Sequence, residues 1–572
     1  MKFLKQLITN KKFPMVGFLI SGGLSILLTE VLSNEGYLAS AFKRWTYYIL
    51  WISLFYFVYL LDQKISLRKF FKWENFQSQI FPILYSLILT SLLFSAIEPE
   101  FRVLADETNL LNVSQAFYLN KEFDHPIEVD YYYETFHFIS SSVPHRPGLW
   151  PFLASLLHTI FGFNVNNAFI LNFLVGFATF YVLILWGKIL ISRVFGYFAA
   201  TILASIPVYA LNVTSGGFDP INLLFLLISG LLLYNYLQDS TALNLELLLI
   251  SVLLGAQCRY ESVILFFLVC IAVLWKYRPS LVEHKPFVFI TIPFLYLPVL
   301  WQRILSPEIV NKGDSGKSAM QFDLVWAHAQ NAWEFFWTSD SFEYPNAPLI
   351  IILAFLGLGI FLNYLKKTKP NRETIVAFGL IAFGIFIIGV IHFAYYLGDY
   401  RFPFIMRYSL VFLGYISLLA AIPLYYLYHN KGWKLIAILL TIFLVGNYLP
   451  VAAKNSRGKS LFLYRDFKMF RKFFNDLPSK NILVISDRPS LYAALGIGSV
   501  NFPYVNQNAN TILAALKRHQ YANIYIIQNV QYVNGLPNPN EILNSEFIFE
   551  PVIELQNSPS GYVRLGRMVV RE

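Results

Sequence analysis

Charged residues are scarce in this chain. Only 14% of its 572 residues are Asp, Glu, Lys or Arg, whereas 56% are hydrophobic. A soluble globular chain carries about 25% charged residues, and at this length it would divide into several domains with charged surfaces. The composition therefore excludes a soluble enzyme, a disordered chain and a nucleic-acid binder as first interpretations.

Cysteine is almost absent as well. The two cysteines, Cys258 and Cys270, both lie in apolar sequence. This excludes a disulfide framework and a Cys-based metal site, and it favours two buried apolar thiols. The sequence also lacks tandem repeats, low-complexity tracts and any distinctive cluster of metal ligands, so it predicts no metal site.

Long apolar runs dominate what is present. A membrane-spanning helix needs about 20 apolar residues, and about thirteen segments approach that length. We expect spans near 14–33, 45–61, 80–97, 167–191, 194–213, 220–237, 243–257, 260–275, 287–304, 348–365, 374–397, 404–428 and 433–451. The chain is thus predicted to be an all-α polytopic membrane protein embedded in a lipid bilayer.

The basic residues between these runs predict the orientation of the chain, because Lys and Arg concentrate in cytoplasmic loops. The basic loops lie at 2–12, 64–72, 188–193, 276–285, 366–372 and 431–434. All of them fall on one side if the N-terminus is cytoplasmic, and Lys43–Arg44 is the one exception. Residues 98–166, 305–347 and the C-terminal segment are then outside. We expect a bacterial plasma (inner) membrane.

The composition changes near Asn455, and from there it is typical of a soluble domain. Two β-branched runs, Asn481–Ser486 and Asn523–Gln528, flank two helical segments, Ser490–Gly496 and Thr511–His519. Strand, helix, helix and strand predict a small C-terminal α/β extracytoplasmic domain.

The predicted domains follow from these divisions of the chain. They are an N-terminal transmembrane hairpin with its cytoplasmic loop (1–79), a membrane domain (80–452) and the extracytoplasmic domain (453–572).

Segment 147–162 is ambiguous. It is short, and as a full span it would reverse every later loop, so we expect a helix at the outer interface.

Two carboxylate motifs lie on the predicted outer face. Asp106-Glu107 follows a membrane exit in the first outer loop, where it could supply a general base, a metal ligand or simply a solvated acidic surface. Asp219 stands directly before Pro220 and a predicted span. It could cap that helix or take part in catalysis, and the two roles are compatible.

Three basic motifs share that face. His145-Arg146 could hold a lipid phosphate or attract headgroups generally. Arg259-Tyr260-Glu261 interrupts an apolar stretch, and charge at membrane depth indicates function by default. Arg259 could meet a phosphate that Glu261 orients, or the two could close a hairpin. Arg401 and Arg407 are further candidates for an anionic ligand or for interfacial anchoring.

The order of these motifs resembles the integral-membrane glycosyltransferases of the GT-C fold, the group of protein O-mannosyltransferases and lipid A aminoarabinose transferases. Ala105-Asp106-Glu107-Thr108 resembles the Asp-Glu motif of the first outer loop, and Arg407-Tyr408 the late Arg-Tyr motif. His145-Arg146-Pro147 stands where the family has a Lys-Pro-Pro-like segment, and His145-Arg146 replaces the usual Lys. The resemblance covers about residues 80–450.

The resemblance implies a donor sugar linked to a polyprenyl phosphate and an inverting transfer to an acceptor hydroxyl. Asp106 would be the general base, with Glu107 and Asp219 positioning the acceptor or the base. Arg259, with His145, Arg146, Arg401 or Arg407, would bind the donor phosphate and stabilise it as it leaves, supported by Tyr260 and Glu261. A divalent cation helps some family members.

The resemblance implies that the acceptor is a glycan, a lipid or a protein. The alternative interpretation is a flippase for lipid-linked glycans, or another membrane transporter without transferase activity. A transporter more typically places its charges near the midplane of the bilayer, and the long acidic outer loop favours the enzyme.

Overall fold

The computed structural model describes residues 13–66, 73–132, 135–276, 287–306, 319–337, 346–402, 404–455, 462–532, 535–544, 547–558 and 561–569. Most residues of the basic loops at 2–12, 64–72 and 276–285 lie outside these ranges. Two parts of the expected outer loop 305–347 lie outside them as well. The described chain forms two compact units, and each is described by itself. The first, here called the membrane unit, comprises residues up to 100, 145–150 and 169–456. The second, the sheet unit, comprises 101–144, 151–168 and the residues from 457 onward.

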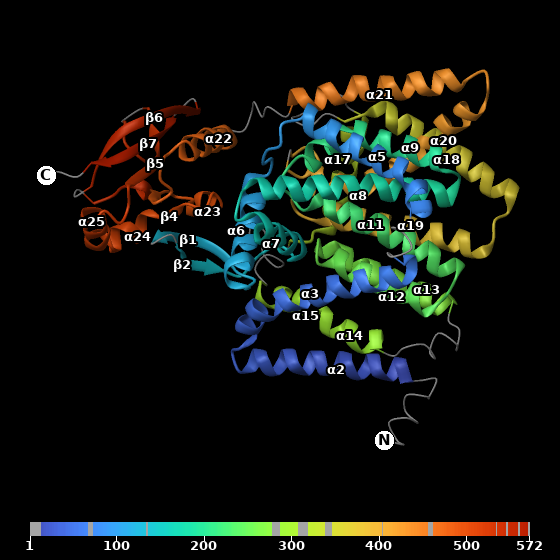
Figure 1. Cartoon of the computed structure of the whole chain (residues 1–572), viewed down its shortest axis with the longest axis horizontal. Coiled ribbons are helices and arrows are strands. Elements are labelled where there is room, and N and C mark those ends of the chain that lie inside the picture. The colour runs from blue at the N-terminus through green and yellow to red at the C-terminus, as the bar shows by residue number, and fades with distance from the viewer. Residues whose placement is uncertain are drawn as a thin grey trace. The chain divides into compact units, whose positions relative to one another are not determined.

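The membrane unit is built of helices, because a helix satisfies every backbone polar group within its own segment. Its elements are α2 (Phe13–Asn34), α3 (Leu38–Ile65), α5 (Trp73–Ala96), α8 (Asn166–Leu190), α9 (Arg193–Ser205), α10 (Pro207–Val213), α11 (Asp219–Gln238), α12 (Ala242–Ala256), η1 (Tyr260–Val263), α13 (Ile264–Lys276), α14 (Phe287–Leu295), α15 (Leu297–Leu305), η3 (Phe322–Leu324), α17 (Val325–Trp337), α18 (Pro348–Thr368), α19 (Arg372–Ala394), η4 (Met406–Ser409), α20 (Leu410–His429) and α21 (Lys434–Asn455). Figure 1 shows the long helices running roughly alongside one another.

The helical, polytopic fold class is confirmed. Within the described residues, nine helices are long and apolar enough to cross a membrane, or ten if the bent pair α9–α10 is one span. This is fewer than the thirteen expected spans, and the difference has identifiable causes. Pro207 stands at the 80° bend between α9 and α10, and Pro298 lies in the first turn of α15, shortly after α14 ends. The Arg259-Tyr260-Glu261 motif leaves α12 and α13 at 15 and 13 residues.

One close helix crossing depends on a glycine. Helix α18 packs against α20 at Gly357, where an added Cβ would collide with the backbone carbonyl of Leu419. Small residues at such crossings let two helix backbones approach closely, and this packing is a main source of helix association in membranes. Gly359, two residues along the same helix, has no heavy atom within 4 Å of its would-be Cβ.

We therefore expect Gly357→Ala to destabilise the membrane unit by about 1–3 kcal/mol, the usual cost of overpacking. Gly359→Ala is the matched control and should be neutral or slightly stabilising, because alanine is the better helix former. Thermal unfolding of both variants in the same detergent measures the difference. Equal melting temperatures for the two would contradict the proposed crossing.

The sheet unit contains one mixed seven-stranded sheet in the order β2-β1-β4-β3-β5-β7-β6. Its elements are α6 (Leu104–Asn120), β1 (His125–Tyr132), β2 (Thr135–Ser142), α7 (Leu149–Phe161), α22 (Phe462–Asn475), β3 (Ile482–Ile485), α23 (Pro489–Ala493), β4 (Gly498–Val500), α24 (Phe502–Gln507), α25 (Ala509–Lys517), β5 (Asn523–Gln531), η5 (Pro539–Glu541), β6 (Ile548–Ser558) and β7 (Gly561–Val569). β3 pairs in parallel with β4 and β5, and the remaining pairs are antiparallel.

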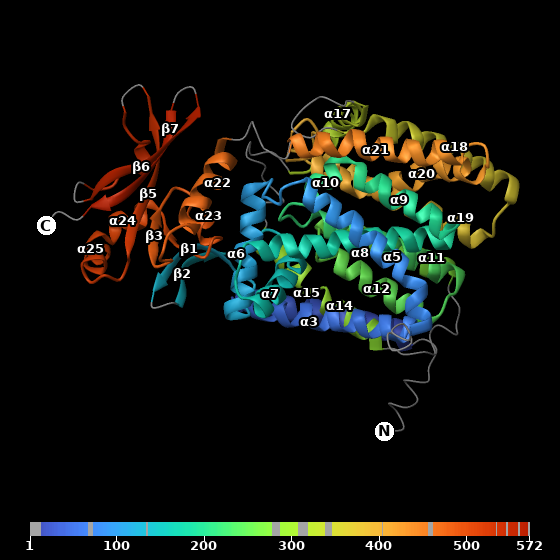
Figure 2. The same ribbon diagram turned by 45° about the horizontal axis from the view of Figure 1, so that its top comes forward.

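Two strands of this sheet come from the first long loop. The β1–β2 hairpin joins β4 through the antiparallel pair Val129–Ser499, and Figure 2 shows it at the edge of the C-terminal strands. Glu128 Oε1 accepts the Asn501 amide at 3.1 Å, and the Tyr521 hydroxyl donates to Asp130 at 2.8 Å. The predicted C-terminal α/β domain is present, but its sheet includes strands that the predicted boundaries assigned to the membrane domain.

Candidate functional site

Four charged side chains from distant parts of the sequence meet inside the membrane unit. Asp219 begins α11, Arg259 and Glu261 flank the start of η1, and Arg407 lies in η4. Asp219, Arg259 and Arg407 are each at most 5% exposed. We call Asp219, Arg259, Glu261 and Arg407 the buried ion cluster. The sequence had singled out all four, in three separate motifs.

Arg259 is the centre of the cluster. Its Nη1 donates to Asp219 Oδ1, and its Nε and Nη2 donate to the two oxygens of Glu261 at 3.3 and 3.1 Å. Its guanidinium also lies 4.3 Å from the centroid of the Tyr408 ring. Arg259 thus forms the local pair with Glu261 that the sequence allowed, and a long-range pair with Asp219 as well.

Arg407 completes the charge balance. Its Nη1 lies 3.4 Å from Asp219 Oδ2, so Asp219 faces an arginine from each carboxylate oxygen. Two guanidinium groups are therefore balanced by two carboxylates, and a buried charge is tolerated only when it is paired in this way. The cluster as a whole carries no excess positive charge.

His392 extends the cluster toward α19. Its Nε2 is 3.7 Å from Glu261 Oε1, and its ring lies 4.9 Å from that of Tyr408. The side chain is 1% exposed, and within the described residues neither ring nitrogen has a hydrogen-bond partner. The sequence analysis did not select His392. A polar residue in an otherwise apolar span was the signal that could have found it.

Hydrogen bonds from neighbouring segments hold the Asp219 loop in place. The Trp150 indole donates to Asn172 Oδ1 at 3.0 Å, and Asn172 Nδ2 donates to the Gly217 carbonyl at 2.9 Å. Asp219 then occupies the first turn of α11, where a negative charge interacts favourably with the helix dipole. Its carboxylate faces the two arginines. At this position directly before Pro220, Asp219 therefore forms ion pairs.

A second basic group surrounds Tyr260. The Tyr260 hydroxyl donates to the His145 carbonyl at 2.8 Å, and Gln302 Nε2 donates to the Arg146 carbonyl at 2.8 Å. The Arg303 guanidinium lies over the Tyr260 ring, 3.9 Å from its centroid.

Arg303 was not selected from the sequence, where it stands at the end of the expected span 287–304. The signal that could have found it is its position at the same predicted outer face as His145-Arg146. Gln302, its neighbour in α15, has the same position and is 2% exposed.

Arg401 lies apart from these groups. It is 55% exposed and pairs with Asp399 through Nη2 at 2.6 Å, and its backbone amide donates to the same carboxylate at 3.0 Å. Burial acts to raise the pKa of Asp399, but the hydrogen bonds and charge of Arg401 outweigh it and hold that pKa below its usual value. The structure therefore does not bring Arg401 into the buried ion cluster.

Asp106 and Glu107 belong to the sheet unit, in the first turn of α6. Asp106 is partly exposed. Glu107 is 1% exposed, and its Oε2 accepts the Arg102 backbone amide at 2.7 Å. Glu107 thus fixes the start of α6, and the neighbouring Asp106 lies in the same first turn.

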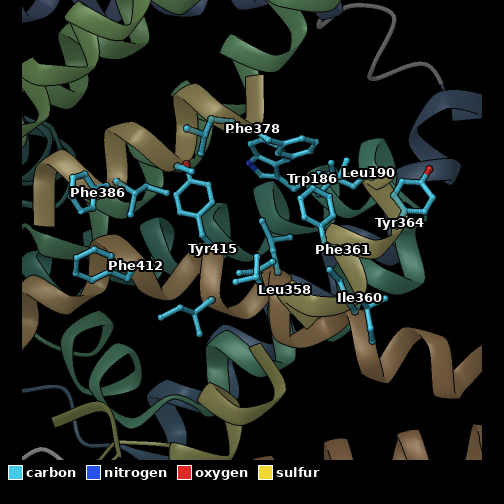
Figure 3. Close-up of a pocket in the computed structure, with 18 of the residues that line it drawn as sticks. Trp186, Leu190, Leu358, Ile360, Phe361, Tyr364, Phe378, Phe386, Phe412 and Tyr415 are labelled. Atoms are coloured by element: carbon cyan, nitrogen blue, oxygen red, sulfur yellow. The ribbon is translucent and has the colours of Figure 1, made fainter. Parts of the chain in front are cut away.

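A large apolar cavity of about 1100 Å³ lies between the helices of the membrane unit. Figure 3 shows side chains of α8, α18, α19 and α20 around it, among them Trp186, Leu190, Leu358, Ile360, Phe361, Tyr364, Phe378, Phe386, Phe412 and Tyr415. Two side chains around it remain well exposed, Phe386 at 65% and Tyr364 at 50%. The cavity is thus open and not enclosed.

Two residues that line the cavity are close in sequence to the ion-cluster region. Phe393 follows His392 directly, and Phe412 stands one helical turn after Tyr408. The apolar lining of the cavity suits the apolar part of a ligand. Within the described parts of the chain, no group of three or more His, Cys, Asp or Glu side chains could hold a metal ion.

Comparisons with known proteins agree with the resemblance seen in the motifs. Residues 145–301 match the family described as dolichyl-phosphate-mannose-protein mannosyltransferase. This segment contains His145-Arg146, Asp219 and Arg259-Tyr260-Glu261. The chain therefore resembles GT-C glycosyltransferases of the protein mannosyltransferase and aminoarabinose transferase group, as the sequence predicted. No curated protein sequence matches the chain.

Solved structures of two proteins are similar to this one. ArnT from Cupriavidus metallidurans bound to undecaprenyl phosphate has a TM-score of 0.47 at 12% identity, covering 86% of this chain and 98% of that one. Its apo state has a TM-score of 0.46 at 10% identity, with the same coverage. The Archaeoglobus fulgidus oligosaccharyltransferase, tethered to an acceptor peptide, has a TM-score of 0.42 at 12% identity, covering 80% of this chain and 69% of that one.

We expect Asp219→Ala to destabilise the membrane unit by about 3 kcal/mol or more, because it leaves two buried guanidiniums without their shared carboxylate. Arg401→Ala breaks an exposed pair instead and should cost about 1 kcal/mol or less. Thermal unfolding in detergent compares the two. If Asp219→Ala unfolds at the wild-type temperature, the buried ion cluster does not stabilise this unit.

Proposed function

We propose that this protein is a membrane glycosyltransferase that moves a sugar from a polyprenyl-phosphate donor to an acceptor hydroxyl, with inversion at the anomeric carbon. One observation carries the proposal. The segment that matches the mannosyltransferase family supplies Asp219, Arg259 and Glu261, and these join Arg407 in one buried ion cluster.

The apolar cavity supports a lipid-linked donor. Its volume of about 1100 Å³ exceeds the usual range of sites for small soluble ligands, and its lining is aromatic and aliphatic. A polyprenyl tail would occupy the cavity and place its phosphate at the polar end, near His392 and Tyr408. Lateral opening between helices allows such a lipid to enter from the bilayer.

In the proposed reaction, the acceptor oxygen attacks the anomeric carbon while the bond from that carbon to the phosphate oxygen breaks. The leaving polyprenyl phosphate keeps the bonding electrons and gains one negative charge. It needs no general acid, because it is already a stable anion. Fixed cations aimed at the developing charge lower the barrier.

Asp106 would accept the proton of the attacking hydroxyl. Its partial exposure at the start of α6 suits a base that must meet an external acceptor. Glu107 would act indirectly, because its carboxylate is occupied by the Arg102 amide. We assign Asp219 to positioning Arg259 and Arg407.

We expect Asp106→Asn to lower the rate of transfer by about 10² or more, because the amide cannot accept the proton. Purified protein in detergent is given radiolabelled polyprenyl-phosphate sugars and acceptor extracts. Asp476→Asn, an exposed carboxylate of the same unit, is the matched control and should keep full activity. Full transfer by Asp106→Asn would show that Asp106 is not the base. If the wild type transfers no sugar but moves labelled lipid across vesicle membranes, that result would favour the flippase interpretation instead.

The proposal also places the N-terminus in the cytoplasm and the sheet unit outside a bacterial plasma membrane. A Cys270→Ser background removes the exposed native thiol. Single cysteines at Asp106 and at Ile542, which is 54% exposed, should then react in whole cells with a membrane-impermeant maleimide. A cysteine at Lys367, in a predicted cytoplasmic loop, should react only after lysis. Protection of Asp106 or Ile542 in intact cells would contradict this topology.

A further inference from the structure

Helix α6 leaves two polar side chains accessible near its start. Of the residues from Leu104 to Phe117, all but Ala105, Asp106 and Asn109 are buried. The other polar side chains of this stretch are buried within the unit: Glu107, Thr108, Asn112, Ser114 and Gln115. Asp106 and Asn109 are therefore the polar groups through which this part of α6 can meet a molecule from outside the unit.

Asp106 and Asn109 also share one face of the helix. Residues three apart are neighbours on a helix surface, with their Cβ atoms about 5–6 Å from each other. The two side chains differ in what they can do, because an ionised carboxylate only accepts hydrogen bonds, whereas an amide nitrogen donates them. An acceptor and a donor of hydrogen bonds thus stand side by side on α6.

His125, at the start of β1, fixes the orientation of the Asn109 amide. His125 Nε2 lies 3.1 Å from Asn109 Oδ1. Since an amide oxygen can only accept, Nε2 carries the hydrogen, and His125 Nδ1 accepts from the Ser142 hydroxyl at 3.2 Å. The ring is 7% exposed, and His125 pairs with Ser142 across the β1–β2 hairpin. The hairpin therefore holds the imidazole against α6.

This contact determines which end of the Asn109 amide is available. With Oδ1 bonded to the imidazole, Nδ2 lies on the opposite side of the amide carbon. Within the described residues, the bond to His125 is the hydrogen bond that the Asn109 side chain forms. The two N–H groups of Nδ2 can therefore donate to a molecule that also reaches Asp106.

A hydroxyl group is complementary to this pair. It has one hydrogen to donate and two lone pairs that accept. The hydrogen would go to the Asp106 carboxylate, one lone pair would accept from Asn109 Nδ2, and the other lone pair would remain for attack on the anomeric carbon. A protonated amine has no lone pair, so it would leave the Asn109 donor unpaired at an energetic cost.

We propose that Asn109 binds the acceptor hydroxyl beside Asp106, and that His125, held by Ser142, is a positioning residue that orients the Asn109 amide. This inference rests on the proposed function and deepens it, because it adds the group that recognises the acceptor. As the acceptor oxygen bonds to the anomeric carbon, its proton passes to Asp106 and the bond from that carbon to the phosphate oxygen breaks. Asn109 donates a hydrogen bond throughout and transfers no proton.

Transfer kinetics of the purified full chain in detergent test the role of Asn109. The assay uses a radiolabelled polyprenyl-phosphate sugar and a dilution series of the acceptor extract. Asn109→Asp keeps the oxygen that faces His125 and loses the Nδ2 donor, and Asn109→Ala loses the donor without adding charge. We expect both to raise the apparent KM for the acceptor about 10-fold or more and to leave the KM for the donor unchanged. Asn475→Asp, at the exposed end of α22, is the matched control and should behave like the wild type.

Two variants of His125 test the positioning role. His125→Ala releases the Asn109 amide and should raise the acceptor KM in the same way. His125→Gln keeps an N–H donor that can reach Asn109 Oδ1 and should restore most of the acceptor affinity. Melting temperatures show that each variant is folded at the assay temperature. Equal acceptor KM values for His125→Ala and His125→Gln would contradict the positioning role, because a purely structural loss changes the amount of active protein and leaves KM unchanged.

The outcomes distinguish this inference from the proposed function. A wild-type acceptor KM in both Asn109 variants, together with loss of transfer in Asp106→Asn, overturns the role of Asn109 and leaves the proposed function intact. No sugar transfer by the wild type overturns both.

Discussion

The ion pairs between Asp219 and two arginines are the constraint on which the membrane unit depends. They join α11, the turn before η1 and η4, three segments that share no local sequence. In an apolar interior each of these charges is tolerated only with its partners, so the three segments must meet in one arrangement. The same pairs fix Glu261 and Tyr260, and through Tyr260 the chain near His145.

Much of the fold could be predicted from the sequence, because bilayer thickness and backbone hydrogen bonding leave few choices for an apolar run. The spans at α11, α18, α19, α20 and α21 follow directly from this rule. The broken helices could not be placed as well, since a proline or a charged triplet ends a helix without shortening the apolar run around it. Pro207 and Arg259 are the clear examples.

The residues of the candidate site were mostly recognisable, but their grouping was not. Arg259 was selected because it is a charge at membrane depth, and Glu261 was recognised as its possible local partner. Whether Arg407 shares Asp219 with Arg259 depends on how α20 packs. No local sequence pattern predicts that packing. Arg401 looked equivalent to Arg407 in the sequence, yet it pairs at the surface with Asp399. His392 was not recognised because it is an isolated polar residue in an apolar span, and Arg303 because it stands at the end of one.

The β1–β2 hairpin has a consequence for the order in which the protein is made. Its strands leave the ribosome early, but their partner β4 is synthesised only after the last helix of the membrane unit. Strand pairing between such distant segments must wait for the complete chain. The sheet unit therefore closes last, and the edge of β1 stays without its neighbour throughout membrane insertion. A chain that stops after α21 would have all its long apolar helices and still expose an unpaired strand edge.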